Sequence, residues 1–131
     1  MGYRKAILTG ALAFAMAVPV SADDDEEDGP LAASWAAIEV NGHPVEGLTF
    51  AYTTQKVSGS GGCNHFSGPI VIEDDAIQIG PLAATKMPCE GKSGIEAEYF
   101  TALEAARSFT VHGDMLSLKA DDGHVLVKFK R

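Results

Sequence analysis

Chemistry-bearing side chains concentrate in the segment 57–68, whose sequence is VSGSGGCNHFSG. Cys63 and His65 stand two positions apart there, so on an extended strand they point to the same side, as a nucleophile and its base would. The chain has one further cysteine, Cys89. In an oxidising compartment the two thiols would form a disulfide, and the thiolate needed for catalysis would not exist. We therefore expect a Cys63–Cys89 disulfide and no catalytic residues.

Glycine crowds the same segment, at positions 59, 61, 62 and 68. Glycine permits positive φ and close backbone approach, and Asn64 tolerates left-handed geometry. A phosphate cradle is the functional alternative, but the sequence GSGGCN contains no lysine and opens no helix. We interpret Gly62, Asn64 and Gly68 as residues of a structural corner.

The other titratable groups predict neither a metal site nor an acid–base pair. The histidines are scattered, without the i, i+4 spacing of metal ligands; they are His43, His65, His112 and His124. The acidic clusters 73–75 and 121–122 fall in expected hairpin turns, where exposure to solvent is the default. We expect no metal and no cofactor.

Residues 1–22 have the features of a secretory signal peptide. Arg4 and Lys5 precede an apolar run from 6 to 18, and Val20-Ser21-Ala22 is typical of a cleavage site. The run is shorter than the ~20 residues of a bilayer-spanning helix, and no cysteine near the cleavage site could accept a lipid. We expect a soluble periplasmic or secreted protein without a membrane span after cleavage.

Removal of residues 1–22 takes away two basic residues and no acid, which leaves 8 basic against 18 acidic side chains, a formal charge of −10. Six consecutive acids open the segment 23–30, which we expect to be a disordered acidic tail. The remainder, 31–131, is one domain's length and carries a charge of −4. This balance argues against nucleic acid as a partner, and we expect a monomer.

The elements that must position the corner are mostly strands. Short alternating apolar segments between glycine-containing turns predict a β-rich α+β fold, with strands at 35–40, 48–58, 69–72, 76–79, 109–112, 115–120 and 125–130. Segment 81–92 is expected to be an irregular crossing held by Cys89. The overall prediction is a small, strongly bent antiparallel β-sheet or partly open barrel packed on one amphipathic helix.

That helix is expected from Ser93, because only this stretch has helical period. Ser93 would be the N-cap and Glu96 would complete a capping box. The apolar stripe that faces the sheet comprises Ile95, Tyr99, Ala102, Leu103 and Ala106.

Aromatic side chains are expected to fill the core, and the alternative is that they line a ligand cavity in an incompletely filled barrel. They are Trp35, Phe50, Tyr52, Tyr99 and Phe129.

Several motifs, taken in order, resemble the META/HslJ-like domain family of bacterial envelope proteins. They are Trp35, Gly62-Cys63-Asn64, Phe66, Gly68, Ile79, Leu82-Ala83, Thr85, Cys89, Tyr99, Leu103, Leu116 and Leu118. The resemblance covers nearly all of 31–131. It implies a secreted or envelope-attached domain associated with stress, motility or secretion, with no established catalytic residues. The chain departs from the pattern in lacking a lipid-attachment cysteine and in having Pro88 before Cys89.

From these observations we expect a non-enzymatic periplasmic META/HslJ-like domain, an accessory or binding protein in envelope stress tolerance or assembly. Its partner would be an envelope protein or an apolar ligand, and an aromatic-lined groove beside the helix would favour this interpretation. The alternative is a secreted acidic inhibitor of a cationic enzyme such as lysozyme, which presents loop 41–47 or 81–92.

The disulfide generates the first testable prediction. Cys63→Ser and Cys89→Ser should each lower the free energy of unfolding by roughly 2 to 5 kcal/mol, with little additivity, because either change removes the same cross-link. Denaturant titration measures both variants, and thiol titration of the native, air-exposed protein should find no reactive thiol. Two reactive thiols would contradict the prediction and revive Cys63 with His65 as a chemical site.

Overall fold

The computed structural model describes residues 31–131. The predicted signal peptide, 1–22, and the predicted acidic tail, 23–30, lie outside these residues. Within residues 31–131, no helix is long and apolar enough to cross a lipid bilayer.

The described chain consists of short strands and one helix. The elements are β2 (Ser34–Val40), β3 (His43–Pro44), β4 (Thr49–Thr53), β5 (Lys56–Ser60), β6 (His65–Glu73), β7 (Ala76–Ile79), β8 (Ala83–Ala84), α2 (Ser93–Ala105), β9 (Ser108–His112), β10 (Met115–Lys119) and β11 (Val125–Lys130).

The strands close into an antiparallel barrel. The order β2, β4, β5, β6, β7, β9, β10, β11 returns to its start because β11 pairs with β2, from Val127 opposite Val40 to Lys130 opposite Ala36. β3 pairs with β2 and β8 pairs with β6, both outside this ring. The expected α+β arrangement, with a small, strongly bent antiparallel sheet or partly open barrel packed on one amphipathic helix, is therefore wrong. The fold is mostly β and its eight-stranded barrel is closed, since the first and last long strands supply each other's missing edge.

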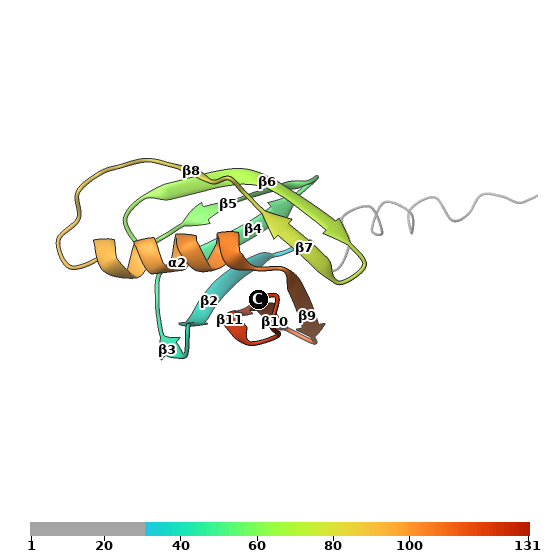
Figure 1. Cartoon of the computed structure of the whole chain (residues 1–131). Helices are drawn as coiled ribbons and strands as arrows, with labels where there is room; N and C mark the ends of the chain where they lie inside the picture. The colour runs from blue at the N-terminus through green and yellow to red at the C-terminus, as the bar shows by residue number, and fades with distance from the viewer. Residues whose placement is uncertain (1–30) are drawn as a thin grey trace, which may run out of the picture. The chain divides into compact units, whose positions relative to one another are not determined.

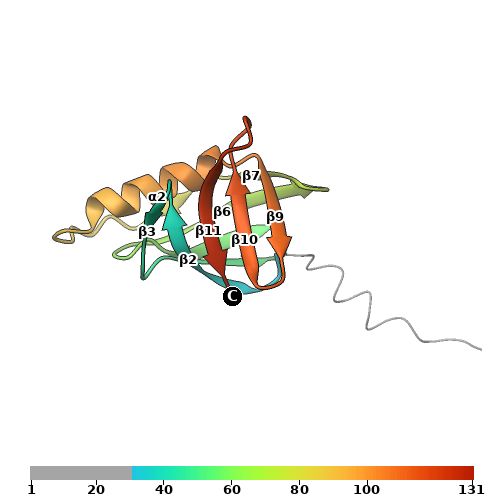
Figure 2. The ribbon, with the colours of Figure 1, turned by 90° about the horizontal axis from the view of Figure 1, so that it is seen from below.

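Helix α2 lies across one end of the barrel (Figures 1 and 2). It contacts β2 and β11 on one side of the ring and β7 on the other. Its buried apolar face consists of Tyr99, Ala102 and Leu103, and the C-cap residue that follows the helix, Ala106, is buried as well. Ile95 was expected on this face but is 46% exposed, because the first turn of the helix directs Glu96, not Ile95, toward the protein.

The start of α2 also differs from the expected capping box. Ser93 is the first helical residue, and the N-cap is Lys92, which makes no side-chain capping bond. The Glu96 carboxylate bonds residues far away in the sequence instead of closing a local box.

A second difference concerns the expected strand 48–58, which is interrupted. Thr54 and Gln55 both have positive φ, of 42° and 66°, and form the turn between β4 and β5. Neither residue is a usual left-handed turn former, so the sequence carried no signal for this hairpin.

The barrel interior is filled, as the core-packing interpretation expected. Trp35, Phe50, Tyr99 and Phe129 are each at most 1% exposed, and Tyr52 packs against them. The rings of Phe50 and Phe129 lie 5.2 Å apart. The buried polar atoms are satisfied, since Tyr99 donates to the carbonyl of Thr49 at 2.7 Å and the Trp35 indole donates to that of Leu31 at 3.2 Å. Trp35 and Phe50 also border an open pocket of about 440 Å³ beside Lys130 and Arg131.

Candidate functional site

The glycine-rich segment forms a tight corner between β5 and β6. Gly62 has a φ of +102°, which favours glycine, and its N–H donates to the Ser60 hydroxyl at 3.1 Å. The turn is closed by the N–H of Gly61, which donates to the carbonyl of Asn64 at 2.9 Å. As a result the N–H groups of Cys63 and Asn64 point away from the strands, toward α2.

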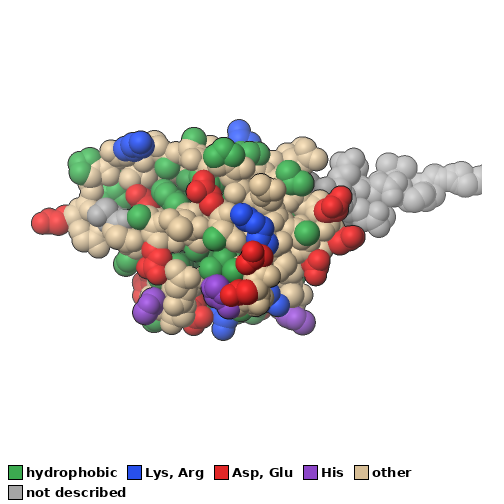
Figure 3. Space-filling view, viewed as in Figure 1, with side chains coloured by type: hydrophobic (Ala, Val, Ile, Leu, Met, Phe, Trp, Pro, Cys, Tyr) green, Lys and Arg blue, Asp and Glu red, His purple; other side chains and the backbone are tan. Residues whose placement is uncertain are grey.

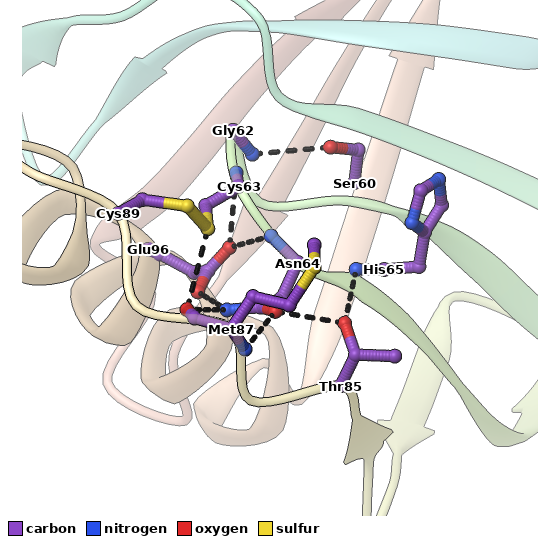
Figure 4. The surroundings of a disulfide bond; sticks show 9 residues. All are labelled: Ser60, Gly62, Cys63, Asn64, His65, Thr85, Met87, Cys89 and Glu96. Atoms are coloured by element: carbon purple, nitrogen blue, oxygen red, sulfur yellow. Dashed lines mark hydrogen bonds between the residues drawn. A yellow bond between two sulfur atoms is a disulfide. The ribbon is translucent and has the colours of Figure 1, made fainter.

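Both N–H groups donate hydrogen bonds to one buried carboxylate, that of Glu96 (Figure 4). Glu96 Oε2 accepts from the Asn64 N–H at 2.6 Å and from the Cys63 N–H at 3.2 Å, while Oε1 accepts from Asn64 Nδ2 at 2.7 Å. Glu96 is 7% exposed and Asn64 is 5% exposed. Burial raises the pKa of Glu96, but the bonds from Asn64 and Cys63 together outweigh it, so the pKa lies below its ordinary value. Glu96 is therefore an anion bound inside the corner.

Asn64 connects this anion to segment 81–92, which we call the crossing segment. Asn64 Oδ1 accepts from the Met87 N–H at 2.7 Å and from the Thr85 hydroxyl at 2.8 Å, while Nδ2 donates to the Met87 carbonyl at 3.2 Å. The side-chain amide of Asn64 thus pairs with both the N–H and the C=O of Met87, as the main chain of a neighbouring strand would.

The predicted disulfide is present and lies beside this network. Cys63 and Cys89 are bonded, with Cα atoms 6.1 Å apart, and join the corner to the crossing segment. Cys63 and His65 do not form a nucleophile–base pair, because the Cys63 sulfur is in the disulfide. His65 is exposed, and its N–H donates to the Thr85 hydroxyl at 3.1 Å.

The remaining predicted motif residues lie at different places. Gly62 and Asn64 are in the corner with the two cysteines. Gly68 lies under the crossing segment, where a Cβ would come within 2.8 Å of the Pro81 carbonyl oxygen. Trp35 is in the core on β2, with the Arg131 guanidinium 4.8 Å from its ring centroid.

Sequence reasoning missed the most informative residue of the corner, Glu96. It assigned this residue to a capping box, although its place three positions before Tyr99 puts it on the buried side of α2. Gly61 is a second residue whose role the sequence did not reveal. The structure shows why glycine is needed there, because a Cβ would lie 2.6 Å from Glu96 Cγ and 2.8 Å from a Phe100 ring carbon. Glycine at 61 lets the carboxylate approach the corner.

Two grooves flank the crossing segment. The helix groove, of about 360 Å³, lies between this segment and α2 and is lined mainly by apolar side chains. Its residues are Asn64, Ala84, Thr85, Lys86, Met87, Pro88, Glu96, Ala97 and Phe100. Figure 3 shows hydrophobic side chains exposed on this face of the molecule. A second groove, of about 580 Å³, lies on the outer face of β4, β5, β6 and β8, and half of its lining residues are serine or threonine.

The other titratable groups of the described residues, 31–131, form no comparable buried cluster. His43, His65, His112 and His124 are exposed. Among residues 31–131, no three His, Cys, Asp or Glu side chains are grouped closely enough to hold a metal ion.

Comparison with known proteins matches the chain to the model of one family, described as META domain, over residues 30–131. The solved structures that this chain resembles include one of a DUF4847 family protein from Bacteroides vulgatus, at 16% identity and a TM-score of 0.61. The similar region covers 79% of this chain and 95% of that protein. A protein from Burkholderia xenovorans is similar at 22% identity and a TM-score of 0.62, covering 95% of this chain and 98% of that one. At these identities the structures show the shared fold alone. No match was found among curated proteins.

Glu96 generates the second prediction. Glu96→Gln should lower the free energy of unfolding at pH 7 by roughly 2 to 3 kcal/mol, because an amide replaces one carboxylate oxygen with a donor that faces the donors of the corner. The native pKa of Glu96 lies below its ordinary value of 4.5, so the stability that this carboxylate contributes is fully present above pH 4.5 and is lost as the pH falls through the native pKa. The difference between wild type and variant should therefore shrink below about pH 4.5.

Glu98→Gln is the matched control on the same helix, since within residues 31–131 its exposed carboxylate accepts only from Asn41 Nδ2, at 2.8 Å. It should change stability by less than about 1 kcal/mol. Urea titrations between pH 3 and pH 7 measure all three proteins. If the difference in the free energy of unfolding between wild type and Glu96→Gln stayed constant over that range, it would contradict the assignment of Glu96 as a buried anion.

Proposed function

Because this chain belongs to the META domain family, we propose that it is a non-enzymatic accessory or binding domain of the periplasm. It acts in envelope stress tolerance or assembly by holding a protein segment or an apolar ligand in the helix groove. The single observation that carries the proposal is this groove, which has apolar walls and an aromatic side chain and lies beside the only helix of residues 31–131.

The exposed side chains of the groove favour an apolar partner. Met87 is 55% exposed, Ala97 is exposed and Phe100 is half-buried. Methionine adapts its unbranched side chain to different apolar surfaces, and an aromatic ring supplies a large contact area. Burial of these groups against a partner would remove apolar surface from water.

The wall of the groove is held in place before any partner arrives. At one end of the crossing segment the Leu82 N–H donates to Glu104 Oε2 at 2.8 Å. At the other end Asn64 bonds both main-chain groups of Met87, and Cys89 is in the disulfide. A wall fixed at both ends loses little conformational entropy on binding, which supports a binding role.

The disulfide also supports the proposed compartment. A Cys63–Cys89 bond persists in oxidising environments such as the periplasm, where the predicted signal peptide would deliver the chain. The same bond supports a non-enzymatic role, since Cys63 offers no thiolate.

Binding is tested by comparing two exposed substitutions. Ala97→Glu places a charge inside the helix groove, whereas Val71→Glu alters an exposed apolar residue of β6 outside it. Tagged oxidised proteins are used to capture partners from periplasmic extract. We expect a partner held by wild type and by Val71→Glu and lost from Ala97→Glu. Equal capture by all three proteins would contradict binding through this groove.

A second candidate function is inhibition of a cationic enzyme such as lysozyme. It is favoured by the crossing segment, most of which is exposed while both ends are fixed. A rigid exposed loop on an acidic protein suits the active site of a basic enzyme. Lysis of bacterial cells by lysozyme should then be slower with the protein present, and more so at low than at moderate salt, because salt screens the attraction. Lysis at an unchanged rate in both conditions would end this candidate.

A further inference from the structure

The crossing segment has one paired edge and one open edge. β8 runs antiparallel to β6, with Ala83 opposite Ser67 and Ala84 opposite Phe66. The pairing continues beyond β8, since the Thr85 N–H donates to the His65 carbonyl at 3.0 Å and Asn64 bonds Met87 as described above. Residues 83, 85 and 87 therefore direct their main-chain groups toward β6.

In an antiparallel strand the alternate residues direct their main-chain groups to the opposite edge. Those residues are Leu82, Ala84, Lys86 and Pro88. The Leu82 N–H is already taken by Glu104, and Pro88 has no N–H. Within residues 31–131, no hydrogen bond involves the main-chain groups of Ala84 or Lys86 on this edge.

The open edge is therefore short and has defined ends. Ala84 and Lys86 each present one donor and one acceptor, about 7 Å apart along the strand. Both residues line the helix groove, whose far wall is formed by Ala97 and Phe100. An edge with free main-chain groups pairs readily with another chain, and proteins normally cover or interrupt such edges. Here Glu104 and Pro88 limit the edge and leave two residues of it open.

We propose that the helix groove binds an extended peptide segment of a partner protein, which adds a strand beside Ala84 and Lys86. This inference rests on the proposed function and names the class of partner. The peptide main chain pairs with the two open residues, and one apolar side chain of the peptide packs between Ala97 and Phe100. An acidic residue of the peptide lies opposite the Lys86 side chain, because opposite charges across a strand pair attract. Strand addition of this kind takes affinity from main-chain bonds and specificity from alternate side chains.

The main-chain groups favour a peptide over a small apolar ligand. An apolar ligand that covered Ala84 and Lys86 would leave their N–H and C=O groups without water or partner, which is costly. A peptide strand supplies both donor and acceptor in the matching order.

The test uses the oxidised protein and a displayed library of random ten-residue peptides, from which binders are selected and synthesised. Lys86→Pro removes the open N–H, whereas the matched control Lys86→Ala keeps it and removes only the charge. Neither change touches the inward bonds of Thr85 and Met87. Proline also suits the extended conformation of the preceding residue. We expect Lys86→Pro to weaken binding of a selected peptide by roughly tenfold or more, and Lys86→Ala by only about threefold or less.

A second measurement reports the strand pairing itself. Amide hydrogen exchange, followed residue by residue, should slow at Ala84 and Lys86 when the peptide is bound, while the already bonded amides of Thr85 and Met87 change little. N-methylation of alternate peptide amides should abolish binding.

The outcomes separate this inference from the proposed function. A peptide that binds wild type, fails to bind Ala97→Glu and leaves the Ala84 and Lys86 amides unprotected overturns strand addition but keeps the groove as a binding site. Equal weakening by Lys86→Pro and Lys86→Ala also overturns it. Selection of no peptide overturns the inference, and the capture experiment with periplasmic extract then decides the proposed function independently.

Discussion

The buried carboxylate of Glu96 connects three parts of the chain, which are helix α2, the corner and, through Asn64, the crossing segment. Its two oxygens accept from the main chain of the corner and from the Asn64 side chain, 32 positions earlier in the sequence. Through Asn64 the same network holds Met87 and Thr85 of the crossing segment. A buried charge without partners would be strongly destabilising, so the corner must keep its N–H groups directed inward whenever α2 is in place. The position of the helix and the shape of the corner therefore depend on each other.

The disulfide and the carboxylate act on the same junction in different ways. The covalent bond restricts how far the crossing segment can move from the corner, in the folded and in the unfolded chain. The hydrogen bonds of Glu96 and Asn64 exist only in the folded chain and set the orientation of the segment. This division explains how an irregular stretch without a long strand of its own can form one wall of a groove. The same two constraints explain why the open edge of the crossing segment stays extended, with Ala84 and Lys86 aligned.

Much of the local structure could be predicted from the sequence, and the long-range closure could not. The disulfide followed from two cysteines and a predicted export signal, the helix from its period, and the β-rich character from alternating residues and glycine turns. The resemblance to the META/HslJ-like family, now supported by the match over residues 30–131, rested on motifs spread along the chain. Barrel closure depends on pairing Ala36 with Lys130, and no local pattern reports a contact over that distance. The burial of Glu96 was missed for the same reason, since its partners at 63 and 64 belong to another element.

The pairing of β11 with β2 also sets an order in time. While the chain is being synthesised, β2 is available long before residues 125–130 exist, and its edge toward β11 has no partner until they emerge. The barrel therefore cannot close on a partly made chain, and its final shape forms only after the last strand has left the ribosome. A chain cut short before β11 would keep open edges on both β2 and β10, where neighbouring copies could pair.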